Sequence, residues 1–126
     1  MENKMRKQLP TPEEALATLK KQPGIDITKQ QAGYRILVET DNSLFDIEVL
    51  NPAAKLIKVY GTTPALRGTV IGQYVKGVYV LDGKVSIDNW IGRTMRMLLH
   101  FRNGDFLSGP VITATVSGPG WKYDIF

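Results

Sequence analysis

The chain has 126 residues, a length that suits one domain able to bury roughly two-thirds of its unfolded surface without metals or disulfides. It contains no cysteine, which excludes a disulfide framework, a thiolate zinc site and a cysteine nucleophile. Sixteen lysines and arginines against twelve aspartates and glutamates give a net charge of +4. The cations are dispersed along the chain, so this excess favours polyanions without requiring them.

The amino-terminal segment is polar and carries several basic residues. We expect residues 1–9 to form a flexible tail and residues 10–126 to form a single all-β domain with an amino-terminal helix. No apolar run follows the basic residues, and no later stretch approaches the roughly 18 apolar residues of a membrane span. The expectation is therefore a soluble, cytoplasmic protein without membrane association.

A short helix is predicted over residues 12–21. Thr11 can cap its first turn, Pro12 suits the first helical position, and Glu14 stands where a capping box requires a carboxylate. Pro23-Gly24 ends the segment. So short a helix is marginal in water by itself, and it therefore needs the end of a sheet or barrel to pack on.

Three dipeptides predict tight hairpins with two-residue turns: Asp41-Asn42, Asp82-Gly83 and Asn103-Gly104. A two-residue loop fixes the register of its strands, and cross-strand partners project to the same face of the sheet. The resulting pairs are Tyr34–Val49, Arg35–Glu48, Ile36–Ile47 and Val38–Phe45 for the first hairpin, Val78–Ile87 and Val80–Val85 for the second, and Phe101–Phe106 and Arg102–Asp105 for the third.

The third hairpin gives the clearest separation into two faces. The predicted core face carries Met95, Met97, Leu99, Phe101, Phe106, Ile112, Ala114 and Val116. The opposite face carries Arg96, His100 and Arg102. Proline cannot donate to a β-ladder, so Gly109-Pro110 predicts an edge position or a bulge.

Further short strands are predicted at residues 25–27, 55–60, 69–75, 77–81 and 121–126, with loops at 61–68 and 88–94. Gly72 indicates a bulge or a close backbone approach. Eight or nine strands at spacings near ten residues, without helical crossovers, predict a mainly β fold. The two candidate architectures are an antiparallel β-sandwich and a β-barrel.

Catalytic groups are sparse. His100 is the only histidine, which excludes a serine-type triad and a metal site with several histidines. Asp46 and Glu48 share a strand face, with Arg35 opposite Glu48, and we interpret them as a solvent-facing charge ladder. No residue is therefore predicted to be catalytic or to bind a metal, and no cofactor is expected.

The residues left for ligand binding are aromatic and basic side chains at loops and strand ends. The candidates are Arg67, Tyr74, Trp90, Arg93, Arg96 and His100. Small β-barrels that hold single-stranded nucleic acid combine stacking rings with such cations. Trp90 is equally suited to closing the end of the barrel or sandwich, because large aromatic residues in β-proteins mostly belong to the core.

The preferred function is a non-enzymatic binding or assembly domain that contacts a protein partner or forms a homo-oligomer. Its most apolar runs, residues 74–81 and 95–101, are candidates for pairing across a two-fold axis. The first alternative is a small β-barrel that binds single-stranded nucleic acid. The second is an enzyme with a carboxylate or arginine site, disfavoured because no pair of groups is placed for proton transfer or nucleophilic attack.

Overall fold

The structure is a computed structural model that describes residues 11–62, 66, 68–81 and 83–126. The predicted tail at 1–9 and the residues Arg67 and Asp82 lie outside this part. The elements are α1 (Pro12–Lys21), β1 (Gly24–Asp26), the 3-10 helix η2 (Ile27–Lys29), β2 (Arg35–Thr40), β3 (Leu44–Asn51), β4 (Leu56–Gly61), β5 (Thr69–Tyr79), β6 (Ser86–Asp88), β7 (Trp90–Gly92), β8 (Met95–Phe101), β9 (Gly104–Gly118) and β10 (Trp121–Asp124). The predicted mainly β class with one amino-terminal helix is confirmed.

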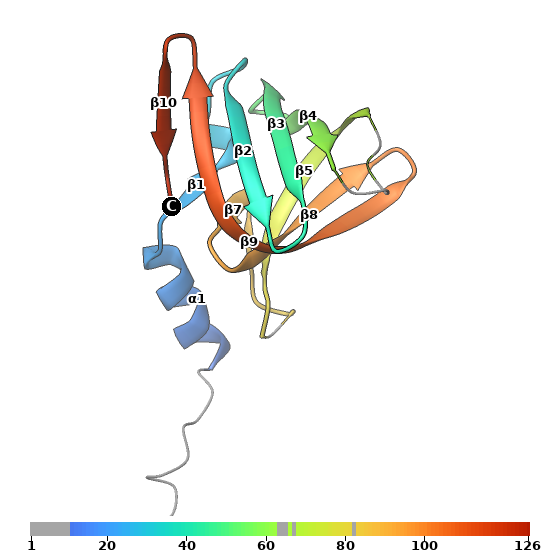
Figure 1. Ribbon diagram of the computed structural model, residues 1–126. Coiled ribbons are helices and arrows are strands. Elements are labelled where there is room, and N and C mark those ends of the chain that lie inside the picture. Colours follow the sequence, from blue (N-terminus) through green and yellow to red (C-terminus); the bar gives the residue numbers. More distant parts are fainter. Residues whose placement is uncertain (1–10, 63–65, 67, 82) are drawn as a thin grey trace, which may run out of the picture.

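Strand pairing closes a six-stranded barrel. The order β9-β2-β3-β4-β5 runs along the main sheet, and β8 pairs with both β5 and β9, which completes the ring. Every pairing is antiparallel, β10 and β6 extend the sheet outside the ring, and β1 and β7 form a separate two-stranded ribbon. Figure 1 shows β2, β3 and β9 side by side, with β5 and β8 behind them. The barrel is thus the observed architecture of the two that the sequence left open.

The helix begins and ends at the predicted residues. Its capping box is complete, because the Glu14 amide donates to Thr11 Oγ1 at 3.2 Å and Glu14 Oε1 accepts from the Thr11 amide at 2.8 Å. Figure 1 shows α1 below the barrel. Its buried residues Ala15 and Leu19 pack with Val85 and Met95 in a small cluster separate from the main core.

The first hairpin has the predicted register. Arg35 pairs with Glu48, Ile36 with Ile47, and Val38 with Phe45. The Thr40 amide donates to the Ser43 carbonyl at 2.9 Å, so the two-residue turn at Asp41-Asn42 is also confirmed. Both apolar pairs lie in the main core.

The third hairpin has a different register from the predicted one. Phe101 pairs with Gly104 and Leu99 with Phe106, so the turn residues are Arg102 and Asn103. The two registers place the same side chains on the same faces, and the hydrophobic pattern alone therefore cannot distinguish them. The observed register brings His100 opposite Asp105, and the two side chains form a hydrogen bond.

A bulge in β9 lies where Gly109-Pro110 predicts an irregularity. Leu98 pairs with Leu107, whereas Arg96 pairs with Pro110, so β9 contains an extra residue here. The buried Ser108 hydroxyl accepts a hydrogen bond from the Met97 amide at 2.8 Å. This extra residue changes which β9 side chains point inward.

Ile112 is consequently on the outside, and its predicted place in the core is wrong. Val111 is buried instead, while 48% of Ile112 is exposed. A second register shift, where Thr40 pairs with Val111 and Glu39 with Thr113, restores the inward direction of Ala114.

Two further strand assignments and the register of the second hairpin differ from the prediction. The two expected strands at 69–75 and 77–81 are one strand, β5, with a register shift between Tyr74 and Lys76. The second hairpin is displaced by one residue, since Val78 pairs with Ser86, and Val80 is 38% exposed instead of paired in the core. The expected loop at 88–94 contains β7, which pairs with β1.

The carboxyl-terminal strand is confirmed. Trp121 pairs with Gly118 at the start of β10, and the Ile125 amide donates to the Ala114 carbonyl at 2.8 Å. The end of the described chain is therefore attached to the barrel.

Gly72 occupies a close approach between two strands, as predicted. A Cβ atom there would overlap the Phe101 ring and the His100 carbonyl oxygen. We expect Gly72→Ala to lower the free energy of unfolding by about 1–3 kcal/mol, because the added methyl group overpacks this site. Gly83→Ala is the control, because nothing lies within 4 Å of a Cβ at Gly83, and its free energy of unfolding should be almost that of the wild type. Denaturant unfolding of the wild type and the two variants measures these values. Equal free energies of unfolding for Gly72→Ala and Gly83→Ala would contradict this packing.

Candidate functional site

The barrel presents two outer walls of different chemistry. We call the outward side chains of β2, β3 and β4 the charged wall; they include Arg35, Glu39, Asp46, Glu48 and Lys58. We call six outward apolar side chains of the loop after β5, of β8 and of β9 the apolar wall; they are Val80, Leu81, Leu98, Leu107, Pro110 and Ile112. Either wall is a possible functional surface.

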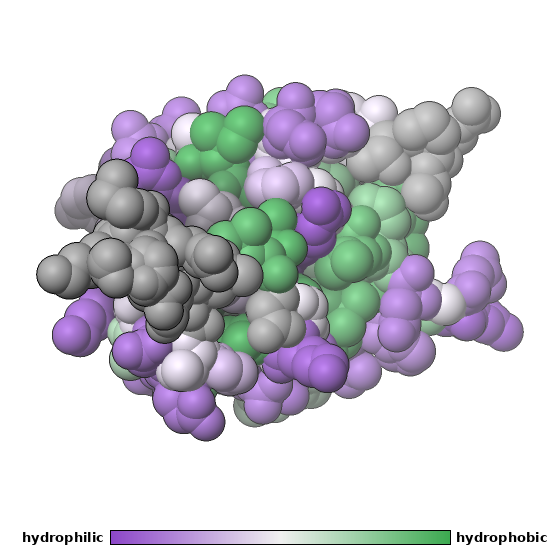
Figure 2. All heavy atoms as spheres, turned by 90° about the horizontal axis from the view of Figure 1, so that it is seen from below, coloured by the Kyte–Doolittle hydropathy of each residue, from purple (hydrophilic) through white to green (hydrophobic). Residues whose placement is uncertain are grey.

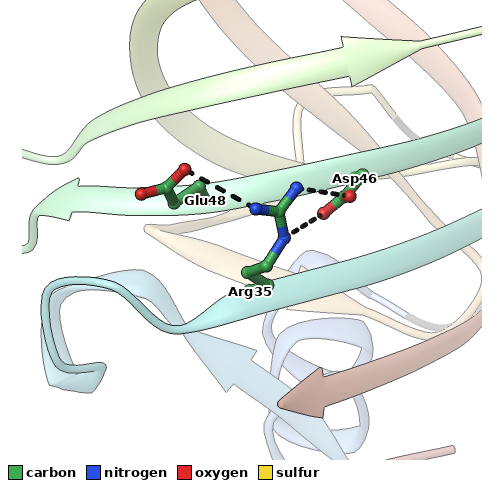
Figure 3. A network of polar contacts seen from close by, with 3 residues as sticks. All are labelled: Arg35, Asp46 and Glu48. Carbon is green, nitrogen blue, oxygen red and sulfur yellow. Dashed lines mark hydrogen bonds and ion pairs between the residues drawn. The ribbon is translucent and has the colours of Figure 1, made fainter. Parts of the chain in front are cut away.

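Arg35 is the centre of the charged wall, where it lies between two carboxylates of β3 (Figure 3). Its Nη2 and Nε donate to the Asp46 carboxylate at 2.6 and 3.2 Å, and its Nη1 lies 3.8 Å from Glu48 Oε1. The hydrogen bond to Asp46 raises the pKa of Arg35. The Arg35 guanidinium also lies 5.6 Å from the centre of the Tyr60 ring. The sequence predicted this ladder, but with Glu48 and not Asp46 as the nearer partner.

A depression of about 180 Å³ adjoins this network. Its lining residues are Arg35, Leu37, Asp46, Thr115, Ser117 and Lys122. The guanidinium in it is already neutralised by Asp46, with side-chain exposures of 44% and 35%, so the pair is open to solvent. Such a pair links the neighbouring strands β2 and β3 and leaves the Arg35 charge compensated by Asp46.

Two of the six predicted ligand-binding residues belong to the interior. Tyr74 is fully buried, and its hydroxyl donates to the Trp90 carbonyl at 2.6 Å. Burial raises the pKa of Tyr74 well above its ordinary value of 10. The half-buried Trp90 ring lies against Gly24 and Gly92 and packs on the helix cluster. In this structure both aromatic residues stabilise the fold.

The remaining candidates are dispersed. Arg93 is exposed in the turn before β8, and Arg96 is half-buried, with Nη1 donating to the Ser108 carbonyl at 3.4 Å. His100 Nδ1 lies 2.6 Å from Asp105 Oδ1 in an exposed hydrogen bond. Arg67 lies outside the described residues. Arg96 and His100 share the outward face of β8, with Leu98 between them, and Arg93 stands in the turn that leads into this strand.

A groove of about 320 Å³ lies at one end of the apolar wall. Tyr79, Val80, Leu81, Thr94 and Pro110 line it. This volume is at the lower end of the range for ligand sites, about 300–1,000 Å³. Figure 2 views the barrel from below and shows hydrophobic residues gathered in the middle and at the right of that face.

Thr94 in the groove wall has an unusual backbone conformation. Its φ is +67°, in the left-handed region that a β-branched residue rarely adopts. Such conformations cost about 1–3 kcal/mol and cluster at functional sites. The Thr94 amide donates to the Val111 carbonyl at 2.8 Å, which ties this turn to the inward residue of β9.

The apolar wall was not predicted from the sequence, although a signal for part of it was present. Leu98 and Leu107 occupy outward positions of the alternating pattern, and an apolar residue at such a position indicates exposed apolar surface. The outward positions of Pro110 and Ile112 could not be predicted in this way. The bulge lies between Leu107 and Pro110, and after it the other set of alternate residues in β9 faces outward.

Comparison of the chain with protein-family models, with curated proteins and with solved structures gave no match. Within residues 11–62, 66, 68–81 and 83–126, no group of three or more His, Cys, Asp or Glu side chains is placed to hold a metal ion. The described part of the chain also has no helix with the length and apolar character needed to span a membrane.

Burial of Tyr74 makes stability sensitive to alkaline pH. Above pH of about 10 the unfolded chain releases the phenolic proton while the folded chain retains it, so the free energy of unfolding falls as pH rises. Tyr74→Phe should remove this component and cost about 1–2 kcal/mol at neutral pH, since the Trp90 carbonyl loses its donor. Urea unfolding of both proteins from neutral to alkaline pH measures the difference. Equal alkaline losses in the two proteins would contradict a buried, protonated Tyr74.

The Arg35–Asp46 pair should contribute little to stability because both groups are partly exposed. A double-mutant cycle with Arg35→Met and Asp46→Asn should give a coupling free energy below about 1 kcal/mol, and added salt should reduce it. Urea unfolding of the four proteins supplies the values. A coupling of several kcal/mol that is insensitive to salt would show that this network has a larger structural role.

Proposed function

We propose that the protein is a non-enzymatic binding or assembly domain that contacts another polypeptide chain through its apolar wall. The observation that carries the proposal is the exposure on that wall: 70% of Leu81, 49% of Leu107 and 48% of Ile112 are accessible. Single exposed apolar residues are ordinary on protein surfaces. Apolar residues that gather on one face, with a groove among them, are typical of interaction sites.

The contact would use a face of the sheet and not the edges of β5 and β8. Along its length β8 pairs with β5 on one side and with β9 on the other. The corresponding part of β5 pairs with β8 and β6. The pairing of residues 74–81 or 95–101 across a two-fold axis, considered from the sequence, therefore has no free edge to use in these strands.

The two alternatives have weaker support. Binding of single-stranded nucleic acid needs exposed rings beside cations, and the two rings predicted for that role do not supply them, because Tyr74 is buried and Trp90 packs against the helix cluster. An enzyme with a carboxylate and arginine site would rely on the network of Arg35, and the groups of that network are paired with one another in solvent.

Selection of a random peptide library on the folded chain tests the proposal. We expect enriched peptides whose affinity, measured by fluorescence anisotropy, falls about tenfold or more in Leu107→Ser, since a buried leucine anchor contributes about 1.5–3 kcal/mol.

The matched control is Leu44→Ser, which removes a leucine of similar exposure, 42%, from β3. This variant should bind the same peptides as the wild-type chain does. Peptides that lose affinity in Leu44→Ser and keep it in Leu107→Ser would contradict the proposal, as would a selection that enriches no peptide.

A further inference from the structure

The charges around the apolar wall identify the kind of partner that it fits. Lys76, Arg93, Arg96 and Arg102 lie on or beside the strands that form the wall. The nearby carboxylates have neighbours of their own: Asp105 contacts His100, Asp88 stands opposite Lys76, and Asp41 lies against Gly109. Among the residues that the structure describes, Arg93 and Arg96 have no carboxylate partner.

These two arginines are neighbours of residues that line the groove. Arg93 directly precedes Thr94, which lines the groove, and Arg96 pairs across the strands with Pro110, which also lines it. Arg96 pairs on its other side with Val78 of β5. The groove is thus a largely apolar hollow with an arginine at two positions adjacent to its lining residues.

We propose that the groove accepts an acidic segment of another protein, with an apolar side chain seated among Val80, Leu81 and Pro110 and with carboxylates contacting Arg93 and Arg96. This inference rests on the proposed function and specifies the chemistry of the partner. Charge complementarity of this kind determines which partners bind and increases the rate of association. A second copy docked wall to wall would bring like charges together, and sedimentation velocity should accordingly find a monomer.

The groove is better suited to a peptide than to a nucleic acid strand. Its described lining is mostly aliphatic, with Tyr79 as its one ring, and it borders exposed leucine and isoleucine. Nucleic acid recognition would instead need several accessible rings on which successive bases stack. Apolar anchors beside carboxylates match both features of this surface.

The peptide selection described above also tests this inference, through the sequences that it enriches. We expect a consensus in which a large apolar residue is flanked by aspartate or glutamate. A synthetic peptide of that consensus should lose affinity about tenfold or more in Leu81→Ser, Arg93→Glu and Arg96→Glu, and also on addition of salt. Leu44→Ser serves as the control and should bind as the wild type does. Of the two charge variants, Arg93→Glu should disturb the fold less, because Arg93 is exposed whereas Arg96 donates a hydrogen bond to the Ser108 carbonyl.

Three outcomes would overturn the inference. The first is a neutral or basic consensus, and the second is an acidic consensus that Arg93→Glu and Arg96→Glu bind as tightly as the wild type does. The third is displacement of the peptide by a single-stranded oligonucleotide that binds more tightly. Peptides whose affinity depends on Leu107 but not on the two arginines would refute the acidic partner and leave the proposed binding to the apolar wall intact. Peptides whose affinity is unchanged in Leu81→Ser and in Leu107→Ser would refute both the acidic partner and the proposed function.

Discussion

The fold depends on β9, the strand that closes the barrel. Its first half pairs with β8 and its second half with β2, so one continuous strand connects the two walls. A regular strand alternates strictly between two faces and cannot serve both walls unless it bends. The extra residue between Leu107 and Pro110 allows the bend, and the buried Ser108 hydroxyl bonds to the Met97 amide there. Val111 can therefore point into the core immediately after the strand changes partners.

The same irregularity produces the surface on which the proposed function rests. By turning Val111 inward, the bulge leaves Pro110 in the groove with Tyr79, Val80 and Leu81, and it leaves Ile112 in solvent. The opposite wall joins its strands through Arg35 and two carboxylates and carries beside them a depression lined mostly by polar side chains. One barrel thus has a wall on which Arg35 is paired with two carboxylates and a wall on which Leu81, Leu107 and Ile112 are exposed.

Local patterns predicted the helix, the first hairpin and the carboxyl-terminal strand, because each has its own start, turn or end signal. The capping box of Thr11 and Glu14 and the pairing of Ile36 with Ile47 needed no information from distant parts of the chain. The exposed position of Ile112 could not be predicted in this way, since it follows from a bulge whose location is set by contacts with β8 and β2 together. The burial of Tyr74 beneath Trp90 likewise depends on the ribbon of β1 and β7, which joins segments far apart in the sequence. The candidate site was missed for this reason, although Leu98 and Leu107 gave a partial indication.

The bulge in β9 turns Val111 into the core and Ile112 into solvent. Methyl NMR with a soluble paramagnetic probe measures this directly, because the probe broadens the signals of accessible methyl groups. We expect strong broadening for Ile112 and Leu107 and almost none for Val111. Protection of Ile112 together with broadening of Val111 would mean that β9 alternates without a bulge, and the apolar wall would not exist as described.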